Sequence, residues 1–391
     1  MWQNLSGRSH RISGSKVGSK MQFIDLHAQY LQLKEDIDAN IKKVLNHGKY
    51  IMGPEVLELE QQLAEYVGVK HCITCGNGTD ALQMVLMAWD IKEGDAVFVP
   101  SFTFMSTAEV VSLVGATPIF TDIDLRTFNM CADSLEEQIK KTLAEGKLKP
   151  KAVIPVDLFG QPADYTKILP IAEKYGLKVL EDGAQGFGGS INGKKACSFG
   201  HAATTSFFPA KPLGCYGDGG AVFTNNDNLA ELLKSIRIHG KGKEKYDNVR
   251  IGLNTRLDTI QAAVLLPKLK AFKEYELQKR NDVAKKYTEA LKEKYKTPYV
   301  PQGVESSWAQ YTLLLNSEEE RNELQRKLQE QGIPSMVYYP KPLHMQTCYK
   351  YLGYDENSLP NAVKASKCVL SLHMSPWISE QQIVIEFLEK I

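Results

Sequence analysis

The sequence predicts an α/β protein with a large domain built on a mostly parallel central sheet and a smaller C-terminal α+β domain. Between residues 54 and 224, short apolar segments alternate with amphipathic helical segments. This alternation is typical of a parallel sheet covered by helices on both faces. After residue 258 it gives way to a long helical stretch, isolated strands and two further helices. A chain of 391 residues is long enough for two such domains.

The expected elements follow in chain order. Apolar positions 37, 41, 44 and 45 predict a helix within 31–45 that ends at Gly48, and Pro54 begins a second helix. Strands are expected near 71–74, 96–99, 117–122, 152–156, 178–181, 204–208 and 221–224, with helices at 80–89, 104–114, 134–145 and 164–175. The second domain is expected to hold strands at 310–315 and 335–338 and helices at 317–331 and 379–390.

The predicted domain limits are 21–265 for the large domain and 266–391 for the small one. The long helical stretch carries Pro267, which is expected to kink it. Residues 1–20 are rich in Ser, Gly, Arg and Lys and precede a second methionine, Met21. They lack the apolar core of a signal peptide, so we expect a disordered leader or an added tail.

Composition excludes several classes of protein. A net charge of +1 without a long basic run argues against a nucleic-acid binder. No apolar run approaches the roughly 18–20 residues of a membrane span. Seven scattered cysteines indicate reduced thiols and a cytoplasmic protein. Cys72 and Cys75 have redox spacing, but in a strand their thiols would point to opposite faces, and no second pair completes a metal site.

Lys211 is the centre of the predicted catalytic site. It lies between Pro209 and Pro212 in an apolar run. Phe207, Phe208 and Leu213 are expected to desolvate the ammonium and lower its pKa, which Schiff-base chemistry requires; a solvated surface lysine is the alternative.

Asp182 follows the predicted strand at 178–181. In a parallel sheet, ligands bind at the carboxyl ends of the strands. A Schiff-base lysine together with an aspartate for a pyridinium nitrogen is what a protein contributes to pyridoxal phosphate (PLP) chemistry. The pair therefore predicts a PLP enzyme with Lys211 and Asp182 as its catalytic residues.

Other residues fit the same cofactor. Gly78 and Thr79 lie in a strand-to-helix turn, where backbone amides and the helix N-terminus favour an anion such as a phosphate. Thr79 and Ser206 could each donate a hydroxyl to that phosphate. Phe102 follows a strand directly, so its ring is expected either to stack on the cofactor or to belong to the core. Gln185 could donate to the 3′-oxygen of the cofactor.

Three further segments are candidates for substrate contacts. Asn254 and Arg256 precede a helix, and Arg256 is either a surface residue or a ligand of phosphate or carboxylate. His239 begins a basic loop that is either solvated or in contact with a nucleotide diphosphate. Tyr339 and His344 belong to a segment that is either a packed interdomain loop or a substrate contact.

The motifs together resemble the DegT/StrS family of sugar-nucleotide aminotransferases, which are fold-type I PLP enzymes. The resemblance covers 21–391, nearly the whole chain. The motifs that carry it are Gly76-Asn77-Gly78-Thr79-Asp80, Pro100-Ser101-Phe102-Thr103-Phe104, Glu181-Asp182-Gly183-Ala184-Gln185, Ser206-Phe207-Phe208-Pro209-Ala210-Lys211 and Asn254-Thr255-Arg256.

The resemblance implies a role for each cofactor residue. Lys211 would carry PLP as a Schiff base, Asp182 would pair with the pyridine nitrogen, Gln185 would contact the 3′-oxygen, and Phe102 would stack on the ring. The phosphate would be held by Gly78, Thr79 and Ser206, and by Asn254 of a second subunit. The protein is therefore expected to be a homodimer with shared active sites.

The resemblance also implies the substrates. Glutamate is the usual amino donor, and residues 206–218 are most similar to enzymes that aminate the 3-keto group of a UDP-linked N-acetylhexosamine-type uronic acid for polysaccharide or lipopolysaccharide biosynthesis. Arg256, His239, Tyr339 and His344 are the expected substrate contacts. The sequence departs from many members at Gly183, where they have Ala, and at Tyr338, where several have His.

Alternatives stay open at this point. The keto-sugar could be the matching 3-keto-hexose nucleotide or a 4-keto-6-deoxy-hexose nucleotide. A 3-dehydratase of the same family would have His in place of Lys211. A non-catalytic PLP-binding regulator is disfavoured because no helix-turn-helix segment is attached. A dinucleotide-binding dehydrogenase is excluded because no Gly-x-Gly-x-x-Gly motif opens the first strand–helix turn.

Overall fold

A central sheet of seven strands organises the large domain. The computed structural model describes residues 21–244 and 246–391, so the predicted leader at 1–20 lies outside the described residues. The strand order is β1-β9-β8-β5-β4-β2-β3. The neighbours from β8 to β3 pair in parallel, whereas β9 runs antiparallel to both β8 and β1. The predicted mostly parallel sheet is confirmed.

The elements of the large domain lie close to their predicted positions. The strands are β1 (His71–Cys75), β2 (Asp95–Pro100), β3 (Thr117–Thr121), β4 (Lys149–Val153), β5 (Lys178–Asp182), β8 (Ala202–Ser206) and β9 (Gly220–Thr224). The helices are α1 (Leu26–His47), α2 (Pro54–Val67), α3 (Gly78–Ala88), α4 (Ser106–Leu113), α5 (Ala132–Glu145), α6 (Tyr165–Lys174), α7 (Asp227–Ile236) and α8 (Thr259–Ala271). The prediction missed α7.

Local signals explain where helices begin and end. Pro54 occupies the first turn of α2, and Gly68 ends it in the left-handed conformation at φ 83°; both residues suit these positions. The Asn77 side chain caps α3 by accepting a hydrogen bond from the Asp80 amide at 2.8 Å. The turn between β1 and α3 is therefore fixed by its own sequence, which places Gly78 and Thr79 at the start of a helix.

Apolar side chains cover both faces of the sheet. On one face, Val85 of α3 packs in a cluster with Ile154 and Leu180. On the other, Leu63 of α2 and Leu265 of α8 belong to a second cluster. All six residues of β2 are buried. A strand buried on both faces reads as a continuous apolar run, which is the pattern that the sequence shows.

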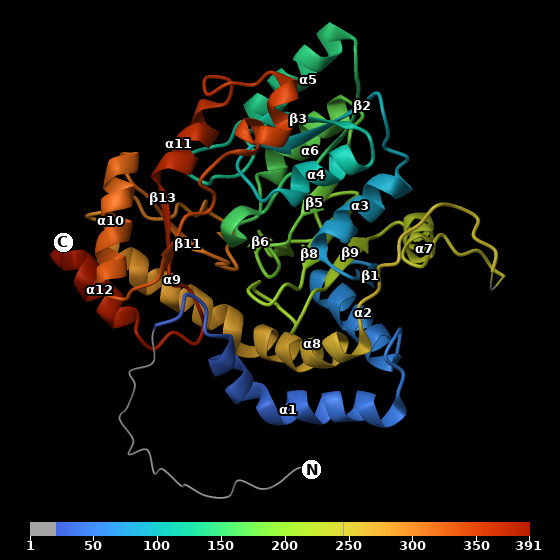
Figure 1. Cartoon of the computed structure of the whole chain (residues 1–391), viewed down its shortest axis with the longest axis horizontal. Helices are drawn as coiled ribbons and strands as arrows, with labels where there is room; N and C mark the ends of the chain where they lie inside the picture. The colour runs from blue at the N-terminus through green and yellow to red at the C-terminus, as the bar shows by residue number, and fades with distance from the viewer. Residues whose placement is uncertain (1–20, 245) are drawn as a thin grey trace, which may run out of the picture.

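The second domain lies to one side of the large sheet and carries the orange and red elements of Figure 1. Its antiparallel sheet has the order β11-β13-β12. Its strands are β11 (Tyr311–Leu314), β12 (Ser335–Met336) and β13 (Val369–Leu372), and its helices are α9 (Leu277–Leu291), α10 (Glu318–Glu330), α11 (Pro360–Cys368) and α12 (Gln381–Lys390). The prediction missed α11 and β13.

Short elements join the two parts. A third small sheet pairs β6 (Ser190–Ile191) with both β7 (Lys194–Lys195) and β10 (Val304–Glu305). Short 3₁₀ turns lie at Leu158–Gly160, Leu343–Met345 and Thr347–Leu352. Because β10 belongs to the C-terminal part of the sequence and β6 to the N-terminal part, the sheet ties the two parts together.

The helix that connects the domains is continuous past Pro267. Helix α8 runs to Ala271, a π-helical turn spans Phe272–Glu276, and α9 continues from Leu277. The change in hydrogen-bond pattern thus follows Pro267 by five residues or more. Phe272 still packs in the large-domain core, whereas Val283 packs in the small-domain core. The domain limit near 265 stays a prediction. The change from the large-domain core to the small-domain core occurs between Phe272 and Val283, which is later in the chain than that limit.

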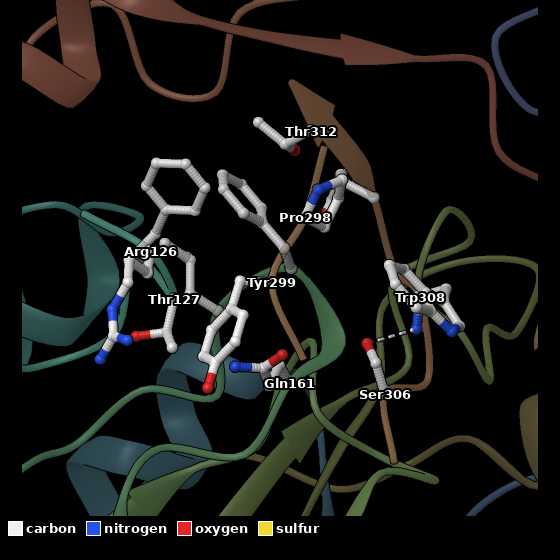
Figure 2. Close-up of a pocket in the computed structure, with 12 residues that line it drawn as sticks. Arg126, Thr127, Gln161, Pro298, Tyr299, Ser306, Trp308 and Thr312 are labelled. Carbon is white, nitrogen blue, oxygen red and sulfur yellow. Dashed lines mark hydrogen bonds between the residues drawn. The ribbon is translucent and has the colours of Figure 1, made fainter. Parts of the chain in front are cut away.

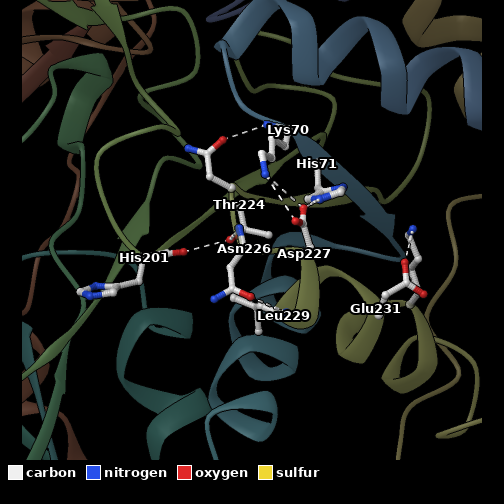
Figure 3. A network of polar contacts seen from close by, with 10 residues as sticks. Lys70, His71, His201, Thr224, Asn226, Asp227, Leu229 and Glu231 are labelled. Carbon is white, nitrogen blue, oxygen red and sulfur yellow. Dashed lines mark hydrogen bonds and ion pairs between the residues drawn. The ribbon is translucent and has the colours of Figure 1, made fainter.

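A network of polar side chains lies at the end of the sheet where β1 begins (Figure 3). His71 Nε2 contacts Asp227 Oδ1 at 2.7 Å, and Lys70 Nζ lies 3.3 Å from Asp227 Oδ2. The Asn225 side chain accepts a hydrogen bond from the Lys70 amide at 2.9 Å. The network is exposed and joins the start of β1 to the start of α7. Within the described ranges, no helix has the length and apolarity needed to cross a bilayer.

Candidate active site

Asp182 is the last residue of β5, at the carboxyl end of the parallel strands. Its side chain is 4% exposed. Thr107 on α4 donates its hydroxyl to Asp182 Oδ2 at 2.9 Å, and the Ala184 amide donates to Oδ1 at 3.2 Å. Burial raises the pKa of Asp182, while these two hydrogen bonds and the charge of Lys211 act in the opposite direction.

Lys211 lies in the loop between β8 and β9, close enough to Asp182 for their charges to interact. Burial lowers the pKa of its ammonium, and the charge of Asp182 opposes that shift. Among the residues that the structure describes, the structure gives Lys211 Nζ no hydrogen-bond or ion-pair partner. Phe207 and Leu213 are buried as expected, but Phe208 is 52% exposed. In the single chain, Phe208 therefore does not belong to the buried apolar surroundings that were expected for the lysine.

The Gly78 turn and Ser206 form a cradle at the start of α3. A Cβ placed on Gly78 would lie 2.8 Å from Ser206 Cβ, and one on Gly220 would lie 2.5 Å from the Asn77 carbonyl oxygen. Only glycine therefore fits at these two positions. Thr79 lies in the first turn of α3, beside the cradle. The structure brings Gly78, Thr79 and Ser206 together, as the motifs predict.

Phe102 and Gln185 lie in an aromatic cluster next to Asp182. Phe102 is 1% exposed, and its ring lies 6.2 Å from the Tyr339 ring and 6.3 Å from the Phe159 ring. The Phe159 amide donates to Gln185 Oε1 at 2.8 Å, and Gln185 Nε2 donates to the Tyr339 hydroxyl at 3.2 Å. A small-domain residue, Tyr339, thus contacts two of the predicted cofactor residues.

The segment that carries Asn254 and Arg256 flanks the cradle. The Gly76 amide donates to the hydroxyl of Thr255 at 2.8 Å, which fixes this segment beside the Gly76–Gly78 turn. Asn254 is exposed, and Arg256 donates to its side-chain oxygen. In the described part of the chain, no carboxylate lies within ion-pair distance of Arg256. The structure thus leaves an unneutralised cation next to the phosphate cradle.

His239 lies on the same surface as Asn254. Its amide donates to the Leu253 carbonyl at 2.7 Å, and its neighbour Ile238 forms a bridge with Asn254. The His239 side chain is exposed. The basic loop that follows projects from the body of the protein, as the yellow segment after α7 shows in Figure 1.

His344 takes up a different position from the one expected for a substrate contact. It is 1% exposed, its Nδ1 lies 2.5 Å from the Ser101 hydroxyl, and its ring lies 6.0 Å from that of Tyr354. The Leu343 amide also donates to the Ser101 carbonyl at 2.7 Å. The packed interdomain loop is the alternative that this geometry favours, and a substrate contact by His344 has no support.

A small cavity lies between the two domains, and Phe159 is among the residues that line it (Figure 2). Its lining includes Arg126, Tyr299, Ser306 and Trp308, and its volume is about 20 Å³. That volume holds about one water molecule. A sugar nucleotide does not fit there, so this cavity is not a candidate for the substrate site.

Thr107 is a residue that sequence reasoning missed. It is fully buried on α4 and makes the one side-chain hydrogen bond to Asp182 within the described residues. A threonine in the first turn of a helix belongs to no recognisable sequence motif. The only available signal was its position shortly after the strand that presents Phe102.

Comparison with known proteins gives one family and several relatives. The family model of the DegT/DnrJ/EryC1/StrS aminotransferases matches residues 31–389. The chain is 47% identical over 366 residues to "UDP-2-acetamido-2-deoxy-3-oxo-D-glucuronate aminotransferase" of Pseudomonas aeruginosa, covering 93% of this chain and 98% of that protein.

Solved structures agree with this match. A DegT DnrJ EryC1 StrS aminotransferase from Brucella abortus is 52% identical, with a TM-score of 0.91 and coverage of 95% of this chain and 99% of the other. The Bacillus subtilis protein NtdA, solved with bound cofactor PMP, is 32% identical, with a TM-score of 0.85 and coverage of 95% and 84%. The predicted resemblance, fold and cofactor are confirmed.

Proposed function

Because the chain belongs to the DegT/DnrJ/EryC1/StrS aminotransferase family, we propose that it transfers the amino group of glutamate to a keto-sugar nucleotide. The keto-sugar we favour is a UDP-2-acetamido-2-deoxy-3-keto-hexuronic acid, aminated at carbon 3. The observation that carries this choice is the 47% identity, over almost the full length of both chains, to a protein named for that activity.

The chain is a PLP-dependent enzyme, and its own geometry fits the cofactor. At the start of α3, Gly78 and Ser206 lie in close contact, since a Cβ on Gly78 would lie 2.8 Å from Ser206 Cβ. The backbone amides of the helix N-terminus and the Ser206 hydroxyl are therefore adjacent donors, which suits a phosphate. Asp182 accepts only neutral donors, Thr107 and the Ala184 amide, so its carboxylate has capacity left for a cationic ring nitrogen. When bound, PLP supplies an electron sink and carries the amino group from donor to acceptor.

The roles proposed for the residues follow from their positions. Lys211 Nζ is partly desolvated, and its lowered pKa favours the neutral amine that takes a proton from the α-carbon of glutamate and delivers a proton to carbon 3 of the sugar. Asp182 keeps the ring nitrogen protonated by charge. Gln185 would contact the 3′-oxygen of the cofactor, and the buried ring of Phe102 would stack on its ring.

A second subunit completes the proposed site. In one chain, Asn254 lies at the surface on a segment held next to the cradle. Ile251 and Val249, on the loop just before it, are 86% and 52% exposed. Exposed apolar side chains beside a polar site are typical of a contact with another protein surface. This supports the proposal of a homodimer in which Asn254 reaches the phosphate in the partner's site.

The substrate itself requires cations. A UDP-linked uronic acid carries a diphosphate and a carboxylate, and arginine binds both with paired hydrogen bonds. Arg256 has the right position for this role, since no described carboxylate neutralises it. His239 lies on the same surface, and Tyr339 meets the cofactor residues from the small domain. We place the reaction in the cytoplasm, in the biosynthesis of a cell-surface polysaccharide such as lipopolysaccharide.

The deciding experiment measures glutamate-dependent turnover of purified 3-keto-uronic, 3-keto-hexose and 4-keto-6-deoxy-hexose nucleotides side by side. We expect the 3-keto-uronic acid to have the highest kcat/KM and to lose most of that advantage in Arg256→Ala, because only this sugar carries the extra carboxylate. Efficient use of the 4-keto sugar alone would contradict the assigned carbon. Cofactor binding without turnover of any sugar would favour a non-catalytic regulator.

A further inference from the structure

A buried pair of carboxyl groups, Asp157 and Glu181, lies directly behind the turn that presents Asp182 and Gln185. Both side chains are 0% exposed. Successive residues of a strand point to opposite faces, so Glu181 points away from Asp182. On that opposite side both acids approach Cys197: its amide donates to Glu181 Oε1, and a Cβ on Gly183 would lie 2.6 Å from Cys197 Sγ and 3.8 Å from Asp157 Oδ2. The two carboxyl groups are close enough to interact.

Asp157 is tied to the Asp182 turn by its backbone and by close packing. The Asp157 amide donates to the Asp182 carbonyl at 3.0 Å, and the Asp182 amide donates to the Pro155 carbonyl at 2.9 Å. A Cβ on Gly186 would lie 2.4 Å from Asp157 Cβ and 2.5 Å from its Oδ2. The Asp157 side chain therefore packs directly against the 182–186 turn. The absence of a side chain at Gly186 allows this close contact.

The hydrogen-bond donors around the pair are unequally divided. Glu181 accepts backbone amides on both oxygens, from Cys197 on Oε1 and from Phe199 on Oε2 at 2.7 Å. Asp157 Oδ1 accepts two donors, the Ala163 amide at 2.9 Å and the Tyr165 hydroxyl at 2.8 Å. Asp157 Oδ2 is buried and has no donor.

Two ionised carboxylates in this position would be costly, because charges in the protein interior need compensation and like charges repel. A single proton on Asp157 Oδ2 removes the second charge and supplies a donor to Glu181. Burial and the charge of Glu181 raise the pKa of Asp157 well above its ordinary value, in agreement with this assignment.

We infer that Asp157 is a neutral carboxylic acid in the working enzyme, and that its hydrogen bond to the Glu181 carboxylate positions the 182–186 turn against the cofactor. Asp157 is thus a positioning residue that acts through Asp182 and Gln185. This inference rests on the proposed roles of those two residues, and it does not depend on which sugar is aminated.

Asparagine at position 157 reproduces the neutral acid. Its amide group donates to Glu181, and its oxygen accepts the same two donors as Oδ1. Asp157→Asn should therefore keep the PLP dissociation constant and kcat within about two-fold of the wild type. Asp157→Val, of similar size without polar atoms, should raise that constant and lower kcat by about ten-fold or more, since it leaves buried groups unpaired.

Glu181→Gln gives the complementary result. Its NH₂ group must face one of the backbone amides of Cys197 and Phe199, which are both donors, so one of these two hydrogen bonds is lost. This variant should weaken PLP binding as much as Asp157→Val does. Asp122→Asn is the matched control: Asp122 is a buried carboxylate that accepts the amides of Asn361 and Ala362 far along the sheet. It should lower the melting temperature and leave the PLP dissociation constant unchanged.

Infrared spectroscopy locates the proton without any activity measurement. At neutral pH, the difference between wild type and Asp157→Asn should contain the carbonyl band of a protonated carboxyl group, in Lys211→Ala protein as well as in the holoenzyme. Absence of that band, or damage by Asp157→Asn equal to that by Asp157→Val, would overturn the inference. So would an Asp157→Val enzyme that loses only thermal stability. If Asp157→Val does not fold, the infrared band and the Asp157→Asn enzyme decide.

Discussion

The charged side chains at the two ends of the central sheet differ in burial and in pairing. Where β1 begins, Lys70, His71 and Asp227 form an exposed network in which each charged group has a partner. Where β5 ends, Asp182 is buried with only neutral donors, and Lys211 is partly buried without a hydrogen-bond or ion-pair partner among the described residues. Both ends hold a lysine and an aspartate, but only one end shields them from water.

This difference in the burial of charged groups indicates which end of the sheet carries the function. Exposed ion pairs are screened by solvent and contribute little to stability. A buried carboxylate and a desolvated ammonium cost free energy in the protein alone, and they are retained where a ligand or a reaction uses them. The carboxyl end of the strands is also where ligands bind in sheets of this type. We therefore expect substitutions at the end of β5 to impair function and matched substitutions at the start of β1 to leave it unchanged.

Lys211→Ala should have the largest effect. It should abolish transamination and the visible absorption band of the bound cofactor while the far-UV circular dichroism stays unchanged, because Lys211 sits in a loop outside the core. The matched control is Lys70→Ala at the other end of the sheet, which should retain wild-type turnover. An active Lys211→Ala enzyme with a normal absorption spectrum would remove the lysine from its role.

Asp182→Asn should keep the fold and bound PLP but lower kcat roughly 10²- to 10⁴-fold, the range typical of a lost proton-handling group. A neutral amide cannot hold the proton on the ring nitrogen by charge. Steady-state kinetics against Asp227→Asn, the exposed aspartate of the other network, provides the comparison. Equal turnover in both variants would show that burial of Asp182 has no catalytic meaning.

Subunit mixing tests whether Lys211 of one subunit and Asn254 of its partner belong to the same active site. Lys211→Ala and Asn254→Ala homodimers should each be inactive or nearly so. After subunit exchange, each heterodimer should hold one intact site, so activity should return to about a quarter of the wild-type level in an equal mixture, since half of the dimers are mixed and each has one of two sites. No recovery after exchange verified by mass spectrometry would argue against a shared site.

Thr107→Val should have a smaller effect with a defined pH dependence. The Thr107 hydroxyl lowers the pKa of Asp182, which burial raises. The ionised carboxylate holds the proton on the ring nitrogen, so kcat falls as the pH drops through the Asp182 pKa. Without the hydroxyl this pKa rises further, and the loss of kcat on the acid side should begin at a higher pH. Steady-state kinetics across pH 4–8 would check this, and an unshifted acid limb would contradict it.

The smallest effect is expected from His71→Ala. It removes an exposed contact to Asp227 and should change neither the PLP dissociation constant nor kcat. Thermal melting should shift only slightly, because the remaining contacts of Lys70 still join β1 to α7. A loss of activity comparable to that of Thr107→Val would break the distinction between the two ends.

Much of the large domain was predictable because its signals are local. The apolar strand before Asp182, the proline and glycine that bound α2, and the glycine turn at Gly78 each act through the backbone of their own segment. Helix α7 was missed although Asn226 caps it and its buried positions recur with helical spacing. Helix α11 and β13 were missed because they follow each other without a turn between Cys368 and Val369.

Residues of the site were predictable only where the local sequence motif itself determines the backbone conformation and so the position of the side chain. Lys211, Asp182 and Gly78 are such cases. The support around them was not, because Thr107, Tyr339 and Asp157 reach Asp182 or Gln185 from distant parts of the sequence. The prediction for His344 lacked the same information: its contact with Ser101 crosses 243 positions of sequence. Contacts of this kind depend on how the two domains pack together.

The most direct test of the account is to trap the cofactor chemically and find the lysine that holds it. Borohydride reduction of the holoenzyme, followed by proteolysis and peptide mass spectrometry, should place a phosphopyridoxyl group on Lys211 alone. Addition of excess glutamate before reduction should prevent the labelling, because the amino group then resides on the released cofactor. A label on another lysine, or a label that glutamate does not diminish, would contradict the assignment of Lys211 as the catalytic lysine.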